Sequence, residues 1–290
     1  MADSSHDCGG TDDPPCRCYG ASFDQGHQFR LLDRPGTFHV SQAGLGLGNY
    51  LVRELRYGDL AGRVLDIGTG SGVMAMLLRS LGATSVAATD ISPAAIATAR
   101  RNELKNFGDA RIDFQHGDLF PPGAEPFDLI VFNPPGWRAP SDQLKVELDE
   151  KHGALDLHAM FYGDSVLLRF LEQLPDHLAE NGRAIVGLNS LVGIDDIFQR
   201  SRTGDATIQT ELLERLEIPL LFYTDAWRQV RESLLAQFER QREEQLASYV
   251  TRGDTIHWFY EITEVTVNKP ALSPLPSPAR SPIAESSASV

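Results

Sequence analysis

The chain has 290 residues, 42% of them hydrophobic and 23% charged, which is the balance of a globular protein with a full hydrophobic core. It contains no apolar run as long as the roughly 18 residues that a bilayer requires, so the sequence predicts no membrane-spanning helix. Its formal net charge is −14, and its one local basic cluster is Arg100, Arg101 and Lys105, which disfavours long duplex nucleic acid as a partner.

The two ends of the chain differ in composition from its middle. Residues 1–30 are rich in Gly, Asp, Pro and Ser, and we expect a flexible acidic leader there, unlike a secretory signal or a transit peptide. The cysteines Cys8, Cys16 and Cys18 all lie in this leader, which favours free thiols over a disulfide framework or a metal site. Residues 269–290 are rich in Pro, Ser and Ala, which predicts a disordered tail. The expected location is the cytoplasm.

Between these ends, apolar strands alternate with amphipathic helices. Ser92 is a predicted N-cap, and Asn181-Gly182 is a helix stop signal. Strands separated by helices predict an α/β fold with a mainly parallel sheet covered on both faces. The predicted strands are Arg63–Ile67, Ser85–Thr89, Arg111–His116, Leu129–Phe132 and Ala184–Leu188, and the predicted helices are Val73–Leu81, Pro93–Phe107 and Val166–Glu180.

The segment from 191 to 252 has a weaker pattern. Leu212–Tyr223 mixes helical and strand signals, and Trp227–Tyr249 is predicted as one long charged helix. We therefore expect a helical insertion around 191–252 within a domain that spans 31–268. Ile256–Val267 alternates in polarity and is predicted as the closing strand of the sheet.

The strongest chemical signal is a glycine-rich turn, in which Asp66 is followed by Gly68, Gly70 and Gly72. Glycine at three alternate positions between a buried strand and a helix lets the backbone turn sharply and approach a ligand closely, because no Cβ intervenes. Asp66 ends the strand, where its carboxylate can meet a positively charged group. Nicotinamide enzymes use a similar turn, so the turn alone does not identify the ligand.

Three further polar residues follow later strands. Asp90 is suited to accept hydrogen bonds from ribose hydroxyls, and Asp118 is suited to bond an adenine amino group. Asn133 follows the strand Leu129–Phe132 and begins an Asn-Pro-Pro turn. Because all three lie at the carboxyl ends of predicted strands, we expect them to face one crevice of the sheet.

This series of residues resembles, in order and spacing, the class I S-adenosylmethionine-dependent methyltransferases. Within that class it is similar to the methyltransferase small domain group, which includes release-factor glutamine methyltransferases and rRNA base N-methyltransferases. The resemblance covers about Phe38–Leu188 and implies a Rossmann-like sheet of seven strands with one antiparallel strand, for which Ile256–Val267 is the candidate. It also implies S-adenosylmethionine as cofactor. The cofactor-binding residues would be Asp66, Gly68, Gly70 and Gly72 at the methionine end, Asp90 at the ribose, Asp118 at the adenine, and Asn133.

The turn Asn133-Pro134-Pro135 carries the predicted catalytic residues. Its two prolines fix φ and remove backbone donors, which leaves the Asn133 carboxamide and the Pro134 carbonyl as hydrogen-bond acceptors. Two acceptors can hold both hydrogens of a planar NH2 group and aim its nitrogen at the sulfonium methyl group. Such an arrangement supplies orientation and electrostatic activation without a strong general base.

The chain departs from the family after the second proline. The best-known members have Tyr or Phe there, an aromatic residue that stacks on the methyl acceptor, whereas this chain has Gly136 followed by Trp137. Trp137 can supply the ring from one position later, as a substrate-binding residue, or it can be a packing residue. His39 lies where family members place residues that cover the cofactor, and it is a second candidate contact.

The sequence thus predicts an S-adenosylmethionine-dependent N-methyltransferase. Its acidity favours a protein side-chain amide or a small-molecule nitrogen as the acceptor. Two alternatives stay open, a nucleobase N-methyltransferase acting on rRNA, tRNA or DNA, and a non-catalytic binding protein that keeps the fold. The sequence indicates neither the acceptor nor the oligomeric state.

Overall fold

The structure is a computed structural model that describes residues 17–34, 37–152, 160–201, 207–222 and 225–268. The predicted tail at 269–290 and the first 16 residues of the predicted leader lie outside the described residues. Within the described ranges, no helix is long and apolar enough to cross a membrane.

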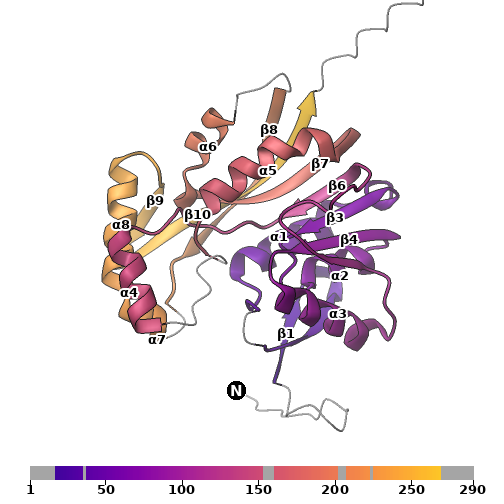
Figure 1. The fold of residues 1–290 in the computed structure, drawn as a ribbon, viewed down its shortest axis with the longest axis horizontal. Helices are drawn as coiled ribbons and strands as arrows, with labels where there is room; N and C mark the ends of the chain where they lie inside the picture. The colour runs from indigo at the N-terminus through magenta and orange to yellow at the C-terminus, as the bar shows by residue number, and fades with distance from the viewer. Residues whose placement is uncertain (1–16, 35–36, 153–159, 202–206, 223–224, 269–290) are drawn as a thin grey trace, which may run out of the picture.

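One mixed sheet forms the centre of the molecule (Figure 1). Its strands are β3 (Arg63–Ile67), β4 (Ser85–Asp90), β5 (Asp113–His116), β6 (Phe127–Phe132), β7 (Leu178–Asn189), β8 (Thr207–Pro219), β9 (Tyr249–Arg252) and β10 (Thr255–Asn268). The strand order is β5-β4-β3-β6-β7-β10-β8, and the short β9 pairs with β10 outside this row. The first five strands of this row, β5, β4, β3, β6 and β7, are parallel to one another. Strand β10 is antiparallel to both of its neighbours in the row, β7 and β8. The predicted Rossmann-like sheet with one antiparallel strand is confirmed, and β9 is an addition to it.

Helices cover both faces of this sheet. Along β3, Val64 packs in a core cluster with α1 (Gln42–Glu54), α2 (Val73–Ser80) and α3 (Pro93–Phe107). The next residue, Leu65, packs in a second cluster with α5 (Gly163–His177) and α6 (Ile194–Arg200). Successive side chains of a strand point to opposite faces, so a continuous apolar strand such as Arg63–Ile67 supplies both clusters.

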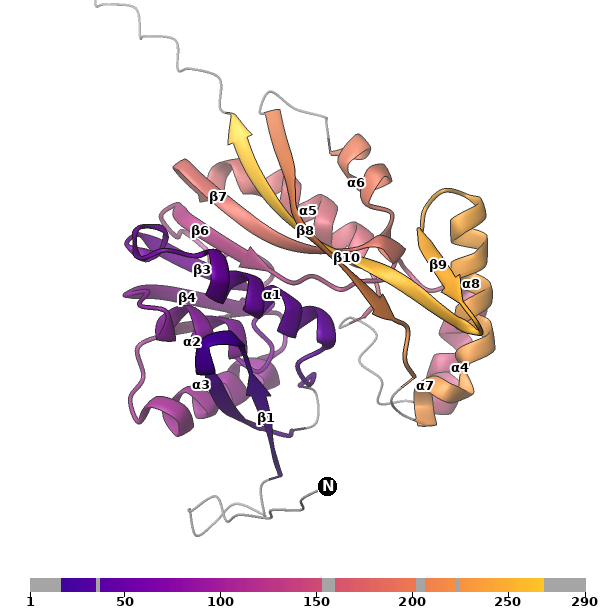
Figure 2. The same cartoon turned by 180° about the vertical axis from the view of Figure 1, so that it is seen from behind.

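A third apolar cluster lies beside the sheet, and we call the elements around it the accessory unit. It comprises α4 (Asp142–His152), α7 (Asp225–Gln229), α8 (Arg231–Glu243) and β9, and Figures 1 and 2 show these elements gathered at one end of the molecule. Strand β9 pairs with Thr255–Trp258 at the start of β10, while Tyr260 pairs with Asn189 at the end of β7. The accessory unit therefore adjoins the carboxyl ends of the parallel strands.

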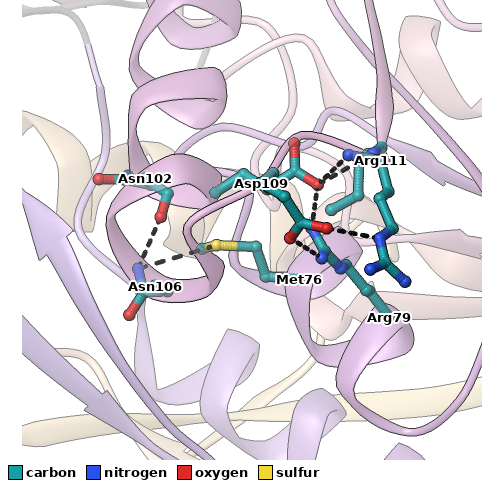
Figure 3. Close-up of polar contacts among 8 residues, drawn as sticks. Met76, Arg79, Asn102, Asn106, Asp109 and Arg111 are labelled. Atoms are coloured by element: carbon teal, nitrogen blue, oxygen red, sulfur yellow. Dashed lines mark hydrogen bonds and ion pairs between the residues drawn. The ribbon is translucent and has the colours of Figure 1, made fainter.

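The predicted leader is too long. Residues 18–32 form a hairpin of β1 (Cys18–Ser22) and β2 (Gln28–Leu32), joined by a 3-10 turn at Asp24–Gly26. Two asparagines of α3 hold this hairpin: the Leu32 N–H donates to Asn102 Oδ1 at 2.9 Å, and the Arg30 N–H donates to Asn106 Oδ1 at 2.8 Å. Figure 3 shows these asparagines one turn apart on α3. The sequence around 18–30 looks polar and loose because its partners lie about 70 residues away.

An ion-pair network joins the C-terminal end of α2 to the second half of α3 and to the residues just before β5. Arg79 of α2 contacts Asp109 and, at 2.6 Å, the buried carboxylate of Glu103. Figure 3 shows Asp109 between Arg79 and Arg111. Glu103 Oε1 also accepts the backbone N–H groups of Arg111 and Ile112, each at 2.9 Å. These bonds occupy the residues just before β5, so this strand starts later than the predicted Arg111.

The predicted helical insertion around 191–252 is only partly helical. Residues 207–219 form β8, which pairs with β10 along its whole length. The long helix predicted for Trp227–Tyr249 is instead α7 and α8, separated at Val230, and Tyr249 begins β9. The Glu, Leu and Arg residues of β8 favour helix, but pairing with β10 overrides that preference.

Candidate active site

The turn between β3 and α2 requires its glycines. Gly68, Gly70 and Gly72 have φ angles of +65°, +53° and +83°. A Cβ on Gly72 would lie 2.9 Å from the Ala99 Cβ and 3.2 Å from the Ala99 Cα, so close packing against α3 also demands glycine. Around Gly70, no atom of the described residues lies within 4 Å of a Cβ built there, which leaves this part of the turn open to a ligand.

Asp66 braces this turn from within the protein. Its Oδ2 accepts the Thr69 hydroxyl at 2.6 Å and the Ala75 N–H at 3.0 Å. Burial raises the pKa of Asp66 to about 7, although the Thr69 and Ala75 hydrogen bonds oppose that shift. The contacts of this oxygen are internal, and the predicted contact of Asp66 with the methionine end of a cofactor stays a prediction.

Asp90, at the end of β4, joins the glycine turn to the next loop. Its Oδ2 accepts the Gly70 N–H at 2.8 Å, and its Oδ1 accepts the Ser92 N–H at 2.8 Å. A carboxylate is also the kind of acceptor that ribose hydroxyls bind. The backbone bonds fix the carboxylate beside the open part of the turn.

Asp118 follows β5, the edge strand next to β4, and so lies at the same end of the sheet as Asp90. Its backbone segment is tied to β4, because the Gly117 N–H donates to the Asp90 carbonyl at 3.0 Å. The side chain is half-exposed and forms an ion pair with Arg169 of α5. A ligand amino group that used this carboxylate would have to share it with the guanidinium.

Asn133 lies directly after β6, next to the glycine turn, since Phe132 pairs with Ile67 of β3. Its half-buried carboxamide accepts a hydrogen bond at Oδ1 from the Tyr260 hydroxyl, at 2.7 Å. The other end of the carboxamide faces α1, where a Cβ on Gly44 would lie 3.7 Å from Asn133 Nδ2. The carboxamide thus lies between Tyr260 of β10 and Gly44 of α1.

The structure contradicts the role predicted for Trp137 as a substrate-binding residue. Trp137 is buried, and its ring packs edge-on against Phe161, Trp227 and Phe238 of the accessory-unit cluster at 5.2 to 5.5 Å between centroids. Edge-on contact with three aromatic rings is a favourable packing geometry for a buried indole. The packing interpretation is therefore the correct one.

The space next to Gly136 is filled by an amide rather than an aromatic ring. A Cβ on Gly136 would lie 2.5 Å from Nδ2 of Asn189 at the end of β7. Asn189 is held in place because its Oδ1 accepts the Leu191 N–H at 2.9 Å. A larger residue at 136, such as the aromatic of the best-known relatives, would displace this side chain.

His39 lies at the surface near the glycine turn. Its Nε2 is 2.9 Å from Asp33 Oδ1, and its ring stacks on Tyr19 at 4.1 Å between centroids. The Tyr19 hydroxyl is buried beside Ser71 of the glycine turn, and burial raises its pKa. Sequence reasoning missed Tyr19 because the hairpin that carries it was assigned to the leader.

Together these side chains line the carboxyl ends of neighbouring strands. The Asp90 carboxylate can accept hydrogen bonds from the hydroxyls of a nucleoside ligand, and the backbone of the open glycine turn can approach such a ligand closely. Beside them, Asn133 and Pro134 each carry a carbonyl oxygen, the kind of acceptor that can hold an NH2 group. Of the predicted residues, Asp66 has internal contacts, and Trp137 is the one that the fold turns away from the crevice.

Residues 28–147 match the methyltransferase small domain family. A protein of Methanocaldococcus jannaschii that is named a protein N5-glutamine methyltransferase is 30% identical over 173 residues, which cover 57% of this chain and 81% of that protein. A release factor glutamine methyltransferase of Koribacter versatilis is 33% identical over 189 residues, which cover 57% of this chain and 62% of that protein. Among solved structures, a methyltransferase from Streptococcus mutans shares the fold with a TM-score of 0.50 at 12% identity, over 88% of this chain and 56% of that one.

Proposed function

Because the chain belongs to the methyltransferase small domain family, whose members use S-adenosylmethionine, we propose that it methylates the nitrogen of a protein side-chain amide held at Asn133-Pro134-Pro135. The observation that carries the proposal is the position of this turn. It follows β6, whose last residue pairs with the last residue of β3, so the Asn-Pro-Pro turn begins beside the strand that leads into the glycine turn.

The residues at the ends of β3 and β4 fit the cofactor. The turn is open at Gly70, where an added Cβ meets no described atom, and the Gly70 N–H holds the Asp90 carboxylate beside it. We assign Gly68, Gly70 and Gly72 to the methionine end, Asp90 to the ribose and Asp118 to the adenine. Asp66 is proposed to support the methionine end through the turn that it braces.

The chain contributes orientation to the reaction. Asn133 Oδ1 and the Pro134 carbonyl would each accept one hydrogen of the acceptor NH2 group, which fixes its plane and turns the nitrogen lone pair toward the glycine turn. These bonds also increase electron density on a conjugated nitrogen, which is otherwise a weak nucleophile. Bound there, S-adenosylmethionine would supply a methyl group on a cationic sulfur, which departs as a neutral thioether as the new N–C bond forms, and the methylated nitrogen would release one proton to water.

Two observations favour a protein amide over a nucleobase. Both sequence relatives described above are named for transfer to glutamine. The net charge of −14 also opposes contact with a phosphate backbone. If the methyl group is transferred to rRNA, tRNA or DNA instead, a nucleobase replaces the protein amide as the acceptor in this proposal. The cytoplasm stays the predicted location.

The test is incubation of the purified protein with methyl-labelled S-adenosylmethionine and a cell lysate separated into protein, nucleic acid and small-molecule fractions. We expect label in the protein fraction, stable to nuclease. Asn133→Ala should lower the initial rate of labelling by about 10²- to 10³-fold, because it removes an interaction that acts on the acceptor in the transition state.

The same variant supplies the control. Calorimetry should give an S-adenosylhomocysteine dissociation constant within about twofold of the wild-type value, because the glycine turn and Asp90 are untouched. Unchanged labelling by Asn133→Ala would exclude the amide clamp. Label that enters only nucleic acid would favour the nucleobase alternative, and binding without any transfer would favour a non-catalytic protein.

A further inference from the structure

The Asn133 carboxamide depends on a residue that lies 127 positions later in the chain. Tyr260 belongs to β10 and is fully enclosed by the core, with 2% of its surface exposed. Its hydroxyl reaches across β7, which lies between β10 and β6, to donate to Asn133 Oδ1 at 2.7 Å. A side chain of one strand thus contacts a residue two strands away.

This contact is possible because β7 has glycine where the tyrosine crosses it. A Cβ on Gly187 would overlap the Tyr260 hydroxyl and would lie 2.9 Å from Cε2 of the ring. In the sheet register, Gly187 pairs with Ile262, while the preceding Val186 pairs with Phe132, the residue before Asn133. The missing side chain at 187 is therefore the opening through which Tyr260 reaches the end of β6.

The bond determines which way the carboxamide faces. Among the described residues, Tyr260 is the one hydrogen-bond partner of the Asn133 side chain. A carboxamide rotated by 180° would place Nδ2 against the hydroxyl, and the phenolic hydrogen would then lack an acceptor inside the core. An unsatisfied buried donor costs about 1–3 kcal/mol, so Oδ1 is the atom that faces Tyr260. Burial also raises the pKa of Tyr260, which keeps the hydroxyl protonated as a donor.

We propose that Tyr260 is the positioning residue of the acceptor site: through Gly187 it holds Asn133 in the orientation that presents the second lone pair of Oδ1 to the NH2 group of the acceptor. The inference rests on the proposed function, because it concerns how Asn133 is oriented toward the acceptor. Tyr260 itself makes no contact with the acceptor. Acceptor binding needs a carboxamide already fixed in plane, because a freely rotating one would lose rotational entropy on each turnover.

The test is a double-mutant cycle of Tyr260→Phe and Asn133→Ala, assayed by the initial rate of label transfer to the lysate fractions. Tyr260→Phe alone should lower the rate by about 10-fold or more while S-adenosylhomocysteine affinity stays within about twofold. In the Asn133→Ala background, Tyr260→Phe should cause no further loss, because its effect passes through Asn133. Tyr50→Phe is the matched control, since Tyr50 packs on the same core cluster without contacting Asn133, and it should retain the wild-type rate.

A second measurement does not depend on turnover. The side-chain amide NMR signals of Asn133, identified by their loss in Asn133→Ala, should shift or broaden in Tyr260→Phe and stay in place in Tyr50→Phe. Equal rate losses from Tyr260→Phe in both backgrounds, or unmoved amide signals, would make Tyr260 a purely structural residue while leaving the proposed function intact. A wild-type protein that transfers no label would overturn the proposed function and the positioning role together.

Discussion

The two halves of the candidate site are built in different ways. At the ends of β3 and β4, the carboxylates of Asp66 and Asp90 accept hydrogen bonds from residues 2 to 20 positions away in the chain. Around the Asn-Pro-Pro turn, the contacts come from distant elements: Tyr260 bonds Asn133, and Asn189 fills the space beside Gly136. Cofactor binding should therefore survive changes that disable the acceptor half, whereas acceptor binding should be sensitive to the packing of β7, β10 and the accessory unit.

The largest expected effect is on the packing of the acceptor half. Trp137→Ala removes a ring that packs against Phe161, Trp227 and Phe238, and we expect a loss of about 3–5 kcal/mol in the free energy of unfolding. Urea unfolding measures this loss. S-adenosylhomocysteine affinity, measured by calorimetry, should stay within about threefold, because the ring does not touch the glycine turn. A loss of affinity in step with stability would show that the halves are coupled.

A smaller effect tests the cofactor half. Asp90→Ala removes the carboxylate that accepts the Gly70 N–H and is proposed to bond the ribose, and we expect the S-adenosylhomocysteine dissociation constant to rise by about 10- to 100-fold. Asp113→Ala, at the opposite end of neighbouring β5, is the matched control and should leave the constant unchanged. An unaltered constant in Asp90→Ala would remove the ribose assignment.

The smallest effect concerns the pH dependence of stability. The pKa of Asp66 is raised by burial to about 7, so between the unfolded and folded pKa values the folded state holds the proton more tightly. The stability contribution is thus complete at low pH and is lost as pH rises through about 7. We expect wild type to lose about 1 kcal/mol between pH 6 and pH 8 from this group.

Asp66→Asn should abolish that loss, since an amide oxygen can still accept the Thr69 and Ala75 bonds but cannot ionise. Urea unfolding at pH 6 and pH 8 compares the two proteins. The assignment fails if the variant retains the wild-type slope between these pH values.

The same contrast explains what the sequence could predict. Helix α3 matches its predicted bounds, and Ser92 caps it as expected by accepting the Ala95 N–H, because both signals are local. The parallel strands and the glycine turn are likewise encoded by short apolar runs and adjacent glycines. The expectation of an antiparallel strand in the sheet, with Ile256–Val267 as its candidate, followed from the family resemblance rather than from these runs.

Three of the errors involve partners that lie far away in the chain. The hairpin at 18–32 is held by Asn102 and Asn106, and β8 is a strand because β10 pairs with it. Trp137 was a candidate for the aromatic ring that stacks on the methyl acceptor. Its ring packs instead against Phe161, Trp227 and Phe238, which lie 24 to 101 positions later in the chain. Tyr260 carried no signal at all, since a tyrosine in an alternating strand indicates burial and nothing more.

The place of β10 in the chain has a consequence for biosynthesis. It enters the sheet between β7 and β8, although it is translated after both of them. The hydrogen bond from Tyr260 to Asn133 can therefore form only after β10 has been translated, when the other strands of the sheet have already been made.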